Sequence, residues 1–323
     1  TSAFSIVTTL VKSFTNSKRT IIASGILSSI LISFGGNLQT IYAFFKPYTP
    51  PENPIPFWNL QFLPFSFPNS YWYPNATRFI PYTIHEFPSY SFVVSDLHGH
   101  VLDIPFVLLT IALFYSIFLA RKITYKLTLL VSFLLSIMYM TNAWDGIIYL
   151  GLFSLCVLAI KYSILKRKNL KTTTKFSIPF LRGLQHKKRY IFDSLKHIAL
   201  AGLGYFIFTL PFNLNFSPFV SGIGVICAPE FLIKIGTIGP LLFEADHCQK
   251  TPLWMFFILY GFFYLFAITL VIKIARLKKL SETHMFLLIL IFFASILIIA
   301  PEFIYAKDIY PQHYRANTVF KLG

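Results

Sequence analysis

Long apolar stretches separated by short polar turns dominate this chain and predict a bundle of membrane-spanning helices. A helix needs about 20 mostly apolar residues to cross the hydrocarbon core of a bilayer. Seven stretches approach that length after a partial one at 3–11, and they cover residues 20–45, 104–120, 124–143, 146–165, 197–212, 252–272 and 284–300. The pattern therefore predicts an all-α fold, a polytopic transmembrane bundle formed by residues 1–323 as one domain.

Charge divides the turns between these stretches into two faces. Alternate turns hold 21 of the 28 Lys and Arg residues, whereas ten of the twelve carboxylates fall in the other turns. Basic loops stay on the cytoplasmic side of a membrane, so the acidic face is predicted to be extracytoplasmic. The sequence thus predicts a multi-pass protein of the plasma membrane with the lipid bilayer as its partner.

Composition supports the membrane interpretation of the net charge of +16. The chain is 55% hydrophobic and only 12% charged. Nucleic-acid binding would require basic residues clustered on a polar surface, whereas here they separate apolar stretches. We therefore expect no nucleic-acid partner. Because the chain opens at Thr1 without a signal peptide and stops at Gly323, we also expect it to be an excerpt of a longer protein.

Residues 166–190 form the most basic segment and are predicted to be a cytoplasmic loop. Such a loop either fixes topology by lying on anionic headgroups or docks a cytosolic partner. On the opposite face, residues 213–251 form an outer loop whose apolar stretches suggest a membrane-surface or re-entrant course. The three cysteines lack metal-ligand spacing, and their positions leave a disulfide between Cys227 and Cys248 open.

Residues 46–103 form a long extracytoplasmic loop that is rich in proline and aromatic residues. Proline restricts the backbone, and Trp and Tyr favour the headgroup level of a bilayer. We therefore expect an ordered loop that lies against the membrane. Loops of this length are usually functional.

The end of this loop carries the densest polar chemistry in the chain. Asp96, His98 and His100 occupy alternate positions, so an extended backbone would point all three side chains the same way. Such a set could bind a divalent metal or phosphate, or hold an imidazole as a proton carrier. A hydrogen-bonded structural turn is the third alternative.

Polar residues also follow two later spans. Asn142 and Asp145 either cap the helix that ends there or belong to a site. After the last span, Arg315 and Lys321 are among the few cations of the outer face, where they either bind an anionic ligand or pair with Glu302 and Asp308.

These residues form an ordered set of short motifs that resembles a known family. The motifs are Arg78-Phe-Ile-Pro81, Ile84-His-Glu-Phe-Pro88, Asp96-Leu-His-x-His100, Asn142-x-Trp-Asp145, Pro301-Glu-Phe and Asn317-Thr-Val-Phe-Lys321. They resemble the polytopic "YYY" membrane proteins, a family of unknown function. His85 stands where that family usually has Asn, and the Asn-Tyr-Tyr-Tyr segment that names the family is absent from this chain.

The resemblance implies a function because the family is similar in layout to GT-C glycosyltransferases, which use sugars linked to lipid phosphates such as polyprenyl phosphate. It implies Glu86 or Asp96 as the catalytic base, and Asp96, His98 and His100 as ligands of Mg or Mn. The residues implied to bind substrate or phosphate are Arg78, Asn142, Asp145, Glu302, Asp308, Arg315, Asn317 and Lys321. The alternatives are a non-catalytic scaffold and a transporter, although the spans carry almost no charge for ion coupling.

Overall fold

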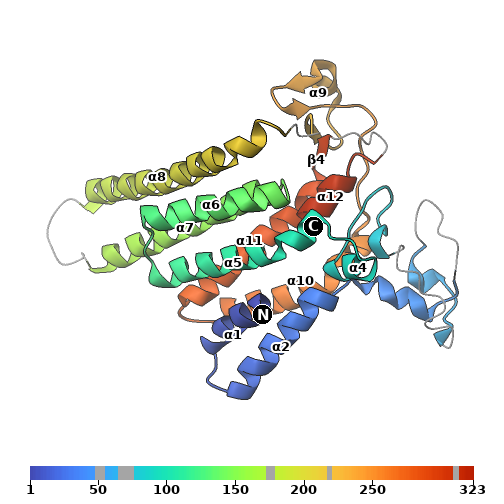
Figure 1. Cartoon of the computed structure of the whole chain (residues 1–323), viewed down its shortest axis with the longest axis horizontal. Helices are drawn as coiled ribbons and strands as arrows, with labels where there is room; N and C mark the ends of the chain where they lie inside the picture. The colour runs from blue at the N-terminus through green and yellow to red at the C-terminus, as the bar shows by residue number, and fades with distance from the viewer. Residues whose placement is uncertain (48–54, 65–75, 172–178, 217–219, 308–312) are drawn as a thin grey trace. The chain divides into compact units, whose positions relative to one another are not determined.

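A computed structural model describes residues 1–47, 55–64, 76–171, 179–216, 220–307 and 313–323. The chain is mostly helical and divides into two compact units (Figure 1). The first unit comprises residues 1–30, 97–216 and 278–290, and the second comprises residues 31–96, 217–277 and 291–323.

Four helices that lie side by side form most of the first unit (Figure 1). They are α5 (Gly99–Ala120), α6 (Tyr125–Thr141), α7 (Asp145–Lys171) and α8 (Pro179–Asn213), and α1 (Ser2–Lys12) packs against α5. Their shared core contains Phe114, Phe118, Leu135 and Phe153, each nearly or fully buried. Burial of such large side chains removes much apolar surface from the surroundings and fixes how the helices pack.

Five helices in the described part of the chain are long and apolar enough to cross a membrane. These segments are Gly99–Ala120, Asp145–Ile164, Tyr190–Asn213, Leu253–Ala275 and Glu282–Glu302. They confirm a multi-span membrane protein. Helix α6 has 17 residues and is shorter than a full span, so the count of seven spans stays a prediction.

The stretch 20–45 is not one straight span, contrary to the sequence prediction. Helix α2 (Lys18–Phe34) ends before Gly35, and the 3-10 helix η1 (Leu38–Phe44) follows at an angle of 72°. Two glycines weaken the helix at this point, and the Asn37 side chain caps the next helix by accepting a hydrogen bond from the Gln39 N–H at 3.0 Å. Counted as one broken span, the pair would be a sixth crossing.

Residues 166–171 and 179–189 are helical but lie between two candidate spans, which end at Ile164 and begin at Tyr190, so the cytoplasmic loop at 166–190 stays a prediction. Helix α7 continues to Lys171, and α8 begins at Pro179. Lys and Arg are good helix formers, and a dense basic composition therefore does not end a helix.

The two carboxylates that the sequence placed among the basic turns both form ion pairs. Asp193 pairs with Lys161 between α8 and α7, and Glu282 pairs with Arg121 at the C-terminal end of α5. The basic face thus neutralises its own carboxylates with side chains from neighbouring helices.

The second unit contains η1, η2 (Phe57–Asn59), α4 (Pro88–Val93), α10 (Leu253–Ala275), the C-terminal half of α11 (Glu282–Ile299), η4 (Ala300–Glu302) and α12 (Ala316–Leu322). Its main core joins η1, the segment around Phe79 and α10. The buried members are Tyr42, Phe79, Ile80, Met255, Ile258, Leu259 and Tyr260. The predicted loop 46–103 is therefore partly ordered by packing on α10.

A small sheet in the second unit corrects the all-α prediction. Its strands are β1 (Gly222–Val225), β2 (Thr237–Ile238), β3 (Leu241–Leu242) and β4 (Ile304–Lys307), in the order β2-β3-β1-β4. Strand β1 is antiparallel to β4 and parallel to β3, and the short helix α9 (Glu230–Ile235) lies between β1 and β2 in the chain. The predicted outer loop 213–251 thus contributes three strands and a short helix, and its membrane-surface or re-entrant course stays a prediction.

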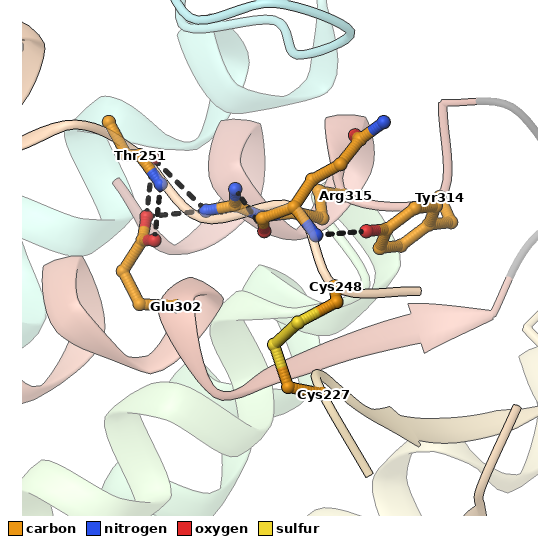
Figure 2. Close-up of a disulfide and its surroundings, with 7 residues drawn as sticks. Cys227, Cys248, Thr251, Glu302, Tyr314 and Arg315 are labelled. Carbon is orange, nitrogen blue, oxygen red and sulfur yellow. Dashed lines mark hydrogen bonds and ion pairs between the residues drawn. A yellow bond between two sulfur atoms is a disulfide. The ribbon is translucent and has the colours of Figure 1, made fainter. Parts of the chain in front are cut away.

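A disulfide joins Cys227 to Cys248 beside this sheet (Figure 2). It resolves the alternative that the cysteine spacing left open. Disulfides persist in oxidising compartments, which agrees with an extracytoplasmic position for this loop.

Candidate functional site

Two aspartates from different helices of the first unit meet at one position, which we call the carboxyl pair. Asp103 lies near the start of α5, and Asp145 is the first residue of α7. Their carboxyl groups are within hydrogen-bonding distance of each other. Asp103 is fully buried. Among the described residues, no N–H group and no Ser, Thr or Tyr hydroxyl donates a hydrogen bond to either of its carboxyl oxygens.

A short turn between α6 and α7 positions Asp145. The Asn142 N–H donates to the Met138 carbonyl at 2.7 Å, and the Asp145 N–H donates to the Asn142 carbonyl at 2.9 Å. The Asn142 side-chain amide also donates to Asp145 Oδ2 at 2.8 Å. Asp145 therefore stands at a helix N-terminus, where the exposed N–H groups favour a negative charge. Asn142 is the C-cap residue of α6, and the same turn places Asp145 against Asp103.

Gly99 brings the start of α5 against the end of α6. A Cβ atom at Gly99 would lie 2.5 Å from the Thr141 carbonyl oxygen, closer than any side chain permits. Only glycine allows this approach without displacement of the backbone. The close contact places Asp103, four residues later on α5, beside the turn that carries Asp145.

His98 and His100 flank this contact, but in a geometry that differs from the prediction. His98 is the N-cap of α5 and His100 is the second residue of the helix, with ring centroids 5.7 Å apart. The predicted extended backbone is therefore wrong from Gly99 onward. Asp96 is exposed and belongs to the second unit, where its N–H donates to the Ser91 carbonyl at 2.9 Å after α4.

Across the residues that the structure describes, no three His, Cys, Asp or Glu side chains are close enough together to hold a metal ion. Asp96, His98 and His100 are therefore not assembled as a ligand set. Metal binding by these residues stays a prediction from the sequence.

The carboxyl pair has a distinct chemical capacity. Two carboxyl groups in direct contact repel each other unless they share a proton or hold a cation between them. A pair of this kind can supply one acid and one base, as aspartic dyads do. Tyr149, one turn further along α7, lies within electrostatic range of both carboxyl groups. The sequence alone assigned no role to Asp103 or to Tyr149.

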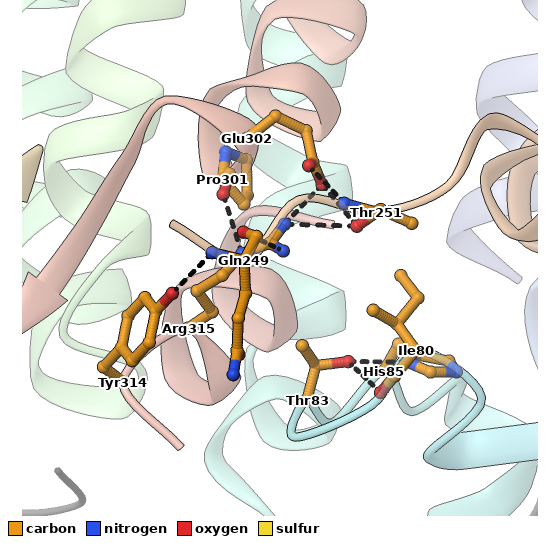
Figure 3. Close-up of polar contacts among 9 residues, drawn as sticks. All are labelled: Ile80, Thr83, His85, Gln249, Thr251, Pro301, Glu302, Tyr314 and Arg315. Carbon is orange, nitrogen blue, oxygen red and sulfur yellow. Dashed lines mark hydrogen bonds and ion pairs between the residues drawn. The ribbon is translucent and has the colours of Figure 1, made fainter. Parts of the chain in front are cut away.

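A second polar group lies in the second unit and centres on Arg315, which is 2% exposed (Figures 2 and 3). Its Nε donates to the Pro301 carbonyl at 3.1 Å, and its Nη1 donates to the Gln249 carbonyl at 2.7 Å. Its Nη2 donates to Thr251 Oγ1 at 3.2 Å and forms an ion pair with Glu302. We call Arg315, Glu302, Thr251 and Gln249 the arginine cluster.

Glu302 is held equally firmly within the arginine cluster. Its carboxylate accepts hydrogen bonds from the Thr251 N–H at 2.8 Å and from the Thr251 hydroxyl at 2.6 Å. The neighbouring Gln249 N–H donates to the Tyr314 hydroxyl at 3.0 Å. Figure 3 shows these contacts converging from three separate segments. Of the two alternatives for Arg315, pairing with Glu302 is confirmed, and its guanidinium is occupied by protein groups.

The sheet beside the arginine cluster carries one more ion pair. Glu244 pairs with Lys307 and accepts a hydrogen bond from the Tyr305 hydroxyl at 2.6 Å. Burial raises the pKa of Glu244, but the hydrogen bonds from Lys307 and Tyr305 outweigh it and hold the pKa below its usual range. His247 stacks on the Tyr305 ring at 5.3 Å. These contacts hold the disulfide-linked segment to β4.

His85 has a structural position in the second unit (Figure 3). It is 5% exposed, and its ring Nε2 accepts a hydrogen bond from the Phe79 backbone N–H at 2.9 Å. The backbone N–H of His85 donates to the Thr77 carbonyl at 2.9 Å. Burial lowers the pKa of its imidazole to about 3. His85 is therefore neutral at physiological pH and fixes the loop that carries Arg78 and Glu86.

The other predicted site residues are dispersed over the second unit. Arg78 is exposed and its Nη1 donates to Thr77 Oγ1 at 3.4 Å, whereas Glu86 is half-buried. Asn317 and Lys321 lie on α12, with Lys321 Nζ 4.8 Å from the Phe320 ring centroid. Asp308 lies outside the described residues.

The structure thus brings together Asn142 with Asp145, His98 with His100, and Glu302 with Arg315. The first two groups are in the first unit and the third is in the second unit.

A comparison with models of protein families finds a match for this chain. The sequence model of a family described as "uncharacterized membrane protein (DUF2298)" matches residues 1–284 and 264–323, which together cover the whole chain. No curated protein and no solved structure matches the chain. The "YYY" name and the likeness to GT-C glycosyltransferases therefore stay predictions from the sequence motifs.

Proposed function

We propose, on the premise that the chain belongs to the DUF2298 family of uncharacterised membrane proteins, that it is a glycosyltransferase of the plasma membrane. It would transfer a sugar from a lipid-phosphate donor, such as a polyprenyl phosphate, on the extracytoplasmic side. The observation that carries the proposal is the carboxyl pair, a fully buried Asp103 against Asp145. Buried like-charge pairs are uncommon outside sites that need an acid or a base.

In the proposed reaction Asp145 is the base and Asp103 is its partner. Asp145 accepts the proton of an acceptor hydroxyl, and the hydroxyl oxygen forms a bond to the anomeric carbon of the donor sugar. The bond between that carbon and the phosphate oxygen breaks, and its electron pair leaves with the lipid phosphate. General base catalysis of this type contributes roughly a hundredfold to ten-thousandfold to a rate.

The geometry assigns supporting roles to neighbouring side chains. The Asn142 amide holds Asp145 Oδ2 at 2.8 Å and so orients the other oxygen for proton transfer. His98 and His100 stand at the start of α5, where ring N–H groups and the helix N-terminus favour an anionic phosphate. The predicted Mg or Mn has no three-ligand set among the described residues, so the proposed reaction does not depend on it.

Proton-coupled transport is the rival use of a buried carboxyl pair. Transporters place such groups near the bilayer midplane, often in broken helices. Asp103 is the fifth residue of α5, and Asp145 is the first residue of α7. Both carboxyl groups therefore lie at the ends of candidate spans, which favours chemistry at the membrane surface.

The test is a transfer assay on the purified protein reconstituted in liposomes with polyprenyl-phosphate-linked sugars and oligosaccharide acceptors. We expect Asp145→Asn to lower the rate per folded molecule by about a hundredfold or more. Asp246→Asn is a matched control, because Asp246 is exposed and its positive φ of 63° suits Asn as well as Asp.

Three outcomes would contradict the proposal. Full activity in Asp145→Asn would remove the carboxyl pair from the mechanism. Loss of activity in Asp96→Asn but not in Asp145→Asn would return the role of base to Asp96. Absence of transfer by the unmodified protein with every donor would overturn the assignment of the activity itself.

A further inference from the structure

The second unit contains a cavity of about 320 Å³ at the break between α2 and η1. Its wall includes Gly36, Asn37 and Thr40 from the break, and Phe87, Ser89 and Tyr90 from the start of α4. All of these residues fall within the second unit, and neither Asp103 nor Asp145 lines the cavity. Its volume is near the lower end of ligand pockets, which hold about 300 to 1,000 Å³, so it suits a small ligand rather than a whole lipid.

Hydrogen bonds join the segments that line the cavity. The Asn37 side-chain amide donates to the Ala76 carbonyl at 2.8 Å, and the Ser89 hydroxyl donates to the Gly35 carbonyl at 3.0 Å. Behind the wall, Phe87 stacks on Phe263 of α10 at 6.1 Å with an interplanar angle of 13°. The ring of Phe87 is therefore fixed from behind by a second aromatic ring, which makes a preformed binding surface.

The chemistry of the wall excludes charged ligands. Among the described residues that line the cavity, none is Asp, Glu, Lys, Arg or His. A phosphate or carboxylate group would lose its hydration here without gaining a counter-charge, which is unfavourable. The wall is mostly apolar, with an Asn amide and hydroxyl groups of Thr and Ser beside two aromatic rings. It therefore suits a ligand that combines apolar faces with a few uncharged polar groups.

We infer that this cavity binds a neutral sugar. A pyranose ring has apolar C–H faces that pack on aromatic rings and hydroxyl groups around its rim that bond to Ser, Thr and Asn. Both features are present in this wall, with Phe87 and Tyr90 as the rings and Asn37, Thr40 and Ser89 as polar partners. The inference concerns binding alone and does not depend on the carboxyl pair being catalytic.

Gly36 provides a selective way to block the cavity. A Cβ atom at Gly36 would have no heavy atom within 4 Å, and Gly36 is not among the described residues with positive φ. Gly36→Leu should therefore fill the cavity from its wall while the backbone keeps its conformation. Gly36→Ala is the matched control, because it adds one methyl group and leaves most of the volume. Thr40→Val removes a hydroxyl group without a change in shape.

The experiment measures binding of neutral mono- and disaccharides of glucose, mannose, galactose and N-acetylglucosamine to the purified protein in nanodiscs. Saturation-transfer NMR and calorimetry give the affinity, with glucuronate as a charged comparator and farnesol as an apolar one. We expect at least one neutral sugar to bind saturably, with glucuronate much weaker. Gly36→Leu should weaken binding by about tenfold or more, which corresponds to about 1.4 kcal/mol, and Gly36→Ala should change it little.

Several results would overturn the inference. The first is that no neutral sugar binds saturably. The second is that a folded Gly36→Leu protein binds sugar with unchanged affinity, and the third is that the cavity binds farnesol more tightly than any sugar. Thermal unfolding of each variant verifies that it is folded. The Asp145→Asn protein should keep its affinity for sugar. Loss of sugar transfer, which tests the proposed function, can therefore be distinguished from loss of sugar binding, which tests this inference.

Discussion

The carboxyl pair and the arginine cluster both bury charged side chains that are distant in the sequence, yet they treat those charges in opposite ways. In the arginine cluster, Arg315 has acceptors at Pro301, Gln249, Thr251 and Glu302, and the carboxylate of Glu302 receives two further hydrogen bonds. In the carboxyl pair, a fully buried Asp103 meets a second carboxyl group, that of Asp145.

This difference in hydrogen bonding indicates a structural role for the arginine cluster and a chemical role for the carboxyl pair. A buried charge with complete hydrogen bonding holds segments together, and removal of either partner leaves the other charge uncompensated. A buried carboxyl group against a second carboxyl group raises the energy of the folded state, and such strain is retained where proton transfer requires it. The arginine cluster should therefore govern stability, and the carboxyl pair should govern activity.

Substitution of Arg315 tests the structural side of the comparison and should have the largest effect on stability. Arg315→Met leaves Glu302 without its cation and should lower the free energy of unfolding by about 3 to 5 kcal/mol, measured by chemical unfolding in micelles. The double variant Arg315→Met/Glu302→Met should recover part of this loss because no lone charge remains. If the Arg315→Met protein had normal stability, the arginine cluster would not have the structural role described here.

The disulfide should contribute the next largest effect. Cys227 and Cys248 are separated by 21 residues, and closure of a loop of this size stabilises a fold by about 3 kcal/mol. Replacement of both residues by Ser should lower the unfolding free energy by that amount. Because Cys248 precedes Gln249, whose carbonyl accepts a hydrogen bond from Arg315, combination with Arg315→Met should cost less than the sum of the two changes. Strict additivity would show that the disulfide and the arginine cluster act independently.

Asp103→Asn should shift stability in the opposite direction. The substitution removes one of two adjacent carboxyl groups, and its amide can donate a hydrogen bond to Asp145. We expect the free energy of unfolding to rise by about 1 to 2 kcal/mol, the range of one relieved buried polar group, while sugar transfer falls. Asp246→Asn, on the exposed surface, serves as the control for both measurements. A marked loss of stability in Asp103→Asn would show that the carboxyl pair has a structural role, as the arginine cluster does.

The pH dependence of the second unit provides the smallest predicted effect. The pKa of His85 falls from 6.5 to about 3 on burial, so the unfolded chain binds a proton that the folded chain does not. The stability due to neutral His85 is complete above pH 6.5 and is lost as the pH falls from 6.5 toward 3. Between pH 7 and pH 5.5 this loss should be about 1 kcal/mol. His85→Gln should flatten the curve in that interval, and equal curves for both proteins would contradict a buried neutral imidazole.

Helix positions were predictable because burial in a bilayer requires long apolar runs. The predicted stretches 104–120, 146–165, 252–272 and 284–300 correspond to helices α5, α7, α10 and α11. The break after Phe34 had a signal in Gly35, Gly36 and Asn37, which are typical of helix ends. The extension of α7 and α8 through the basic segment had none, because charge does not oppose helix formation.

The candidate site was only partly predictable. Pairing of Glu302 with Arg315 followed from the scarcity of outer cations and was one of two alternatives. Contact between Asp103 and Asp145 depends on Gly99 fitting against Thr141, a tertiary contact that local sequence does not encode. The small sheet was missed for the same reason, since β1 pairs with β4 about eighty residues later and each strand is very short.

The state of the cysteines makes this membrane protein a convenient host for thiol chemistry. Cys227 and Cys248 are consumed in the disulfide, and Cys156, which completes the three, is 2% exposed within α7. Residues 1–323 thus present no accessible thiol to a water-soluble maleimide. A single cysteine introduced at exposed Trp58 or Lys122 would be labelled on its own, and the side of the membrane that reacts would report the orientation of the chain directly.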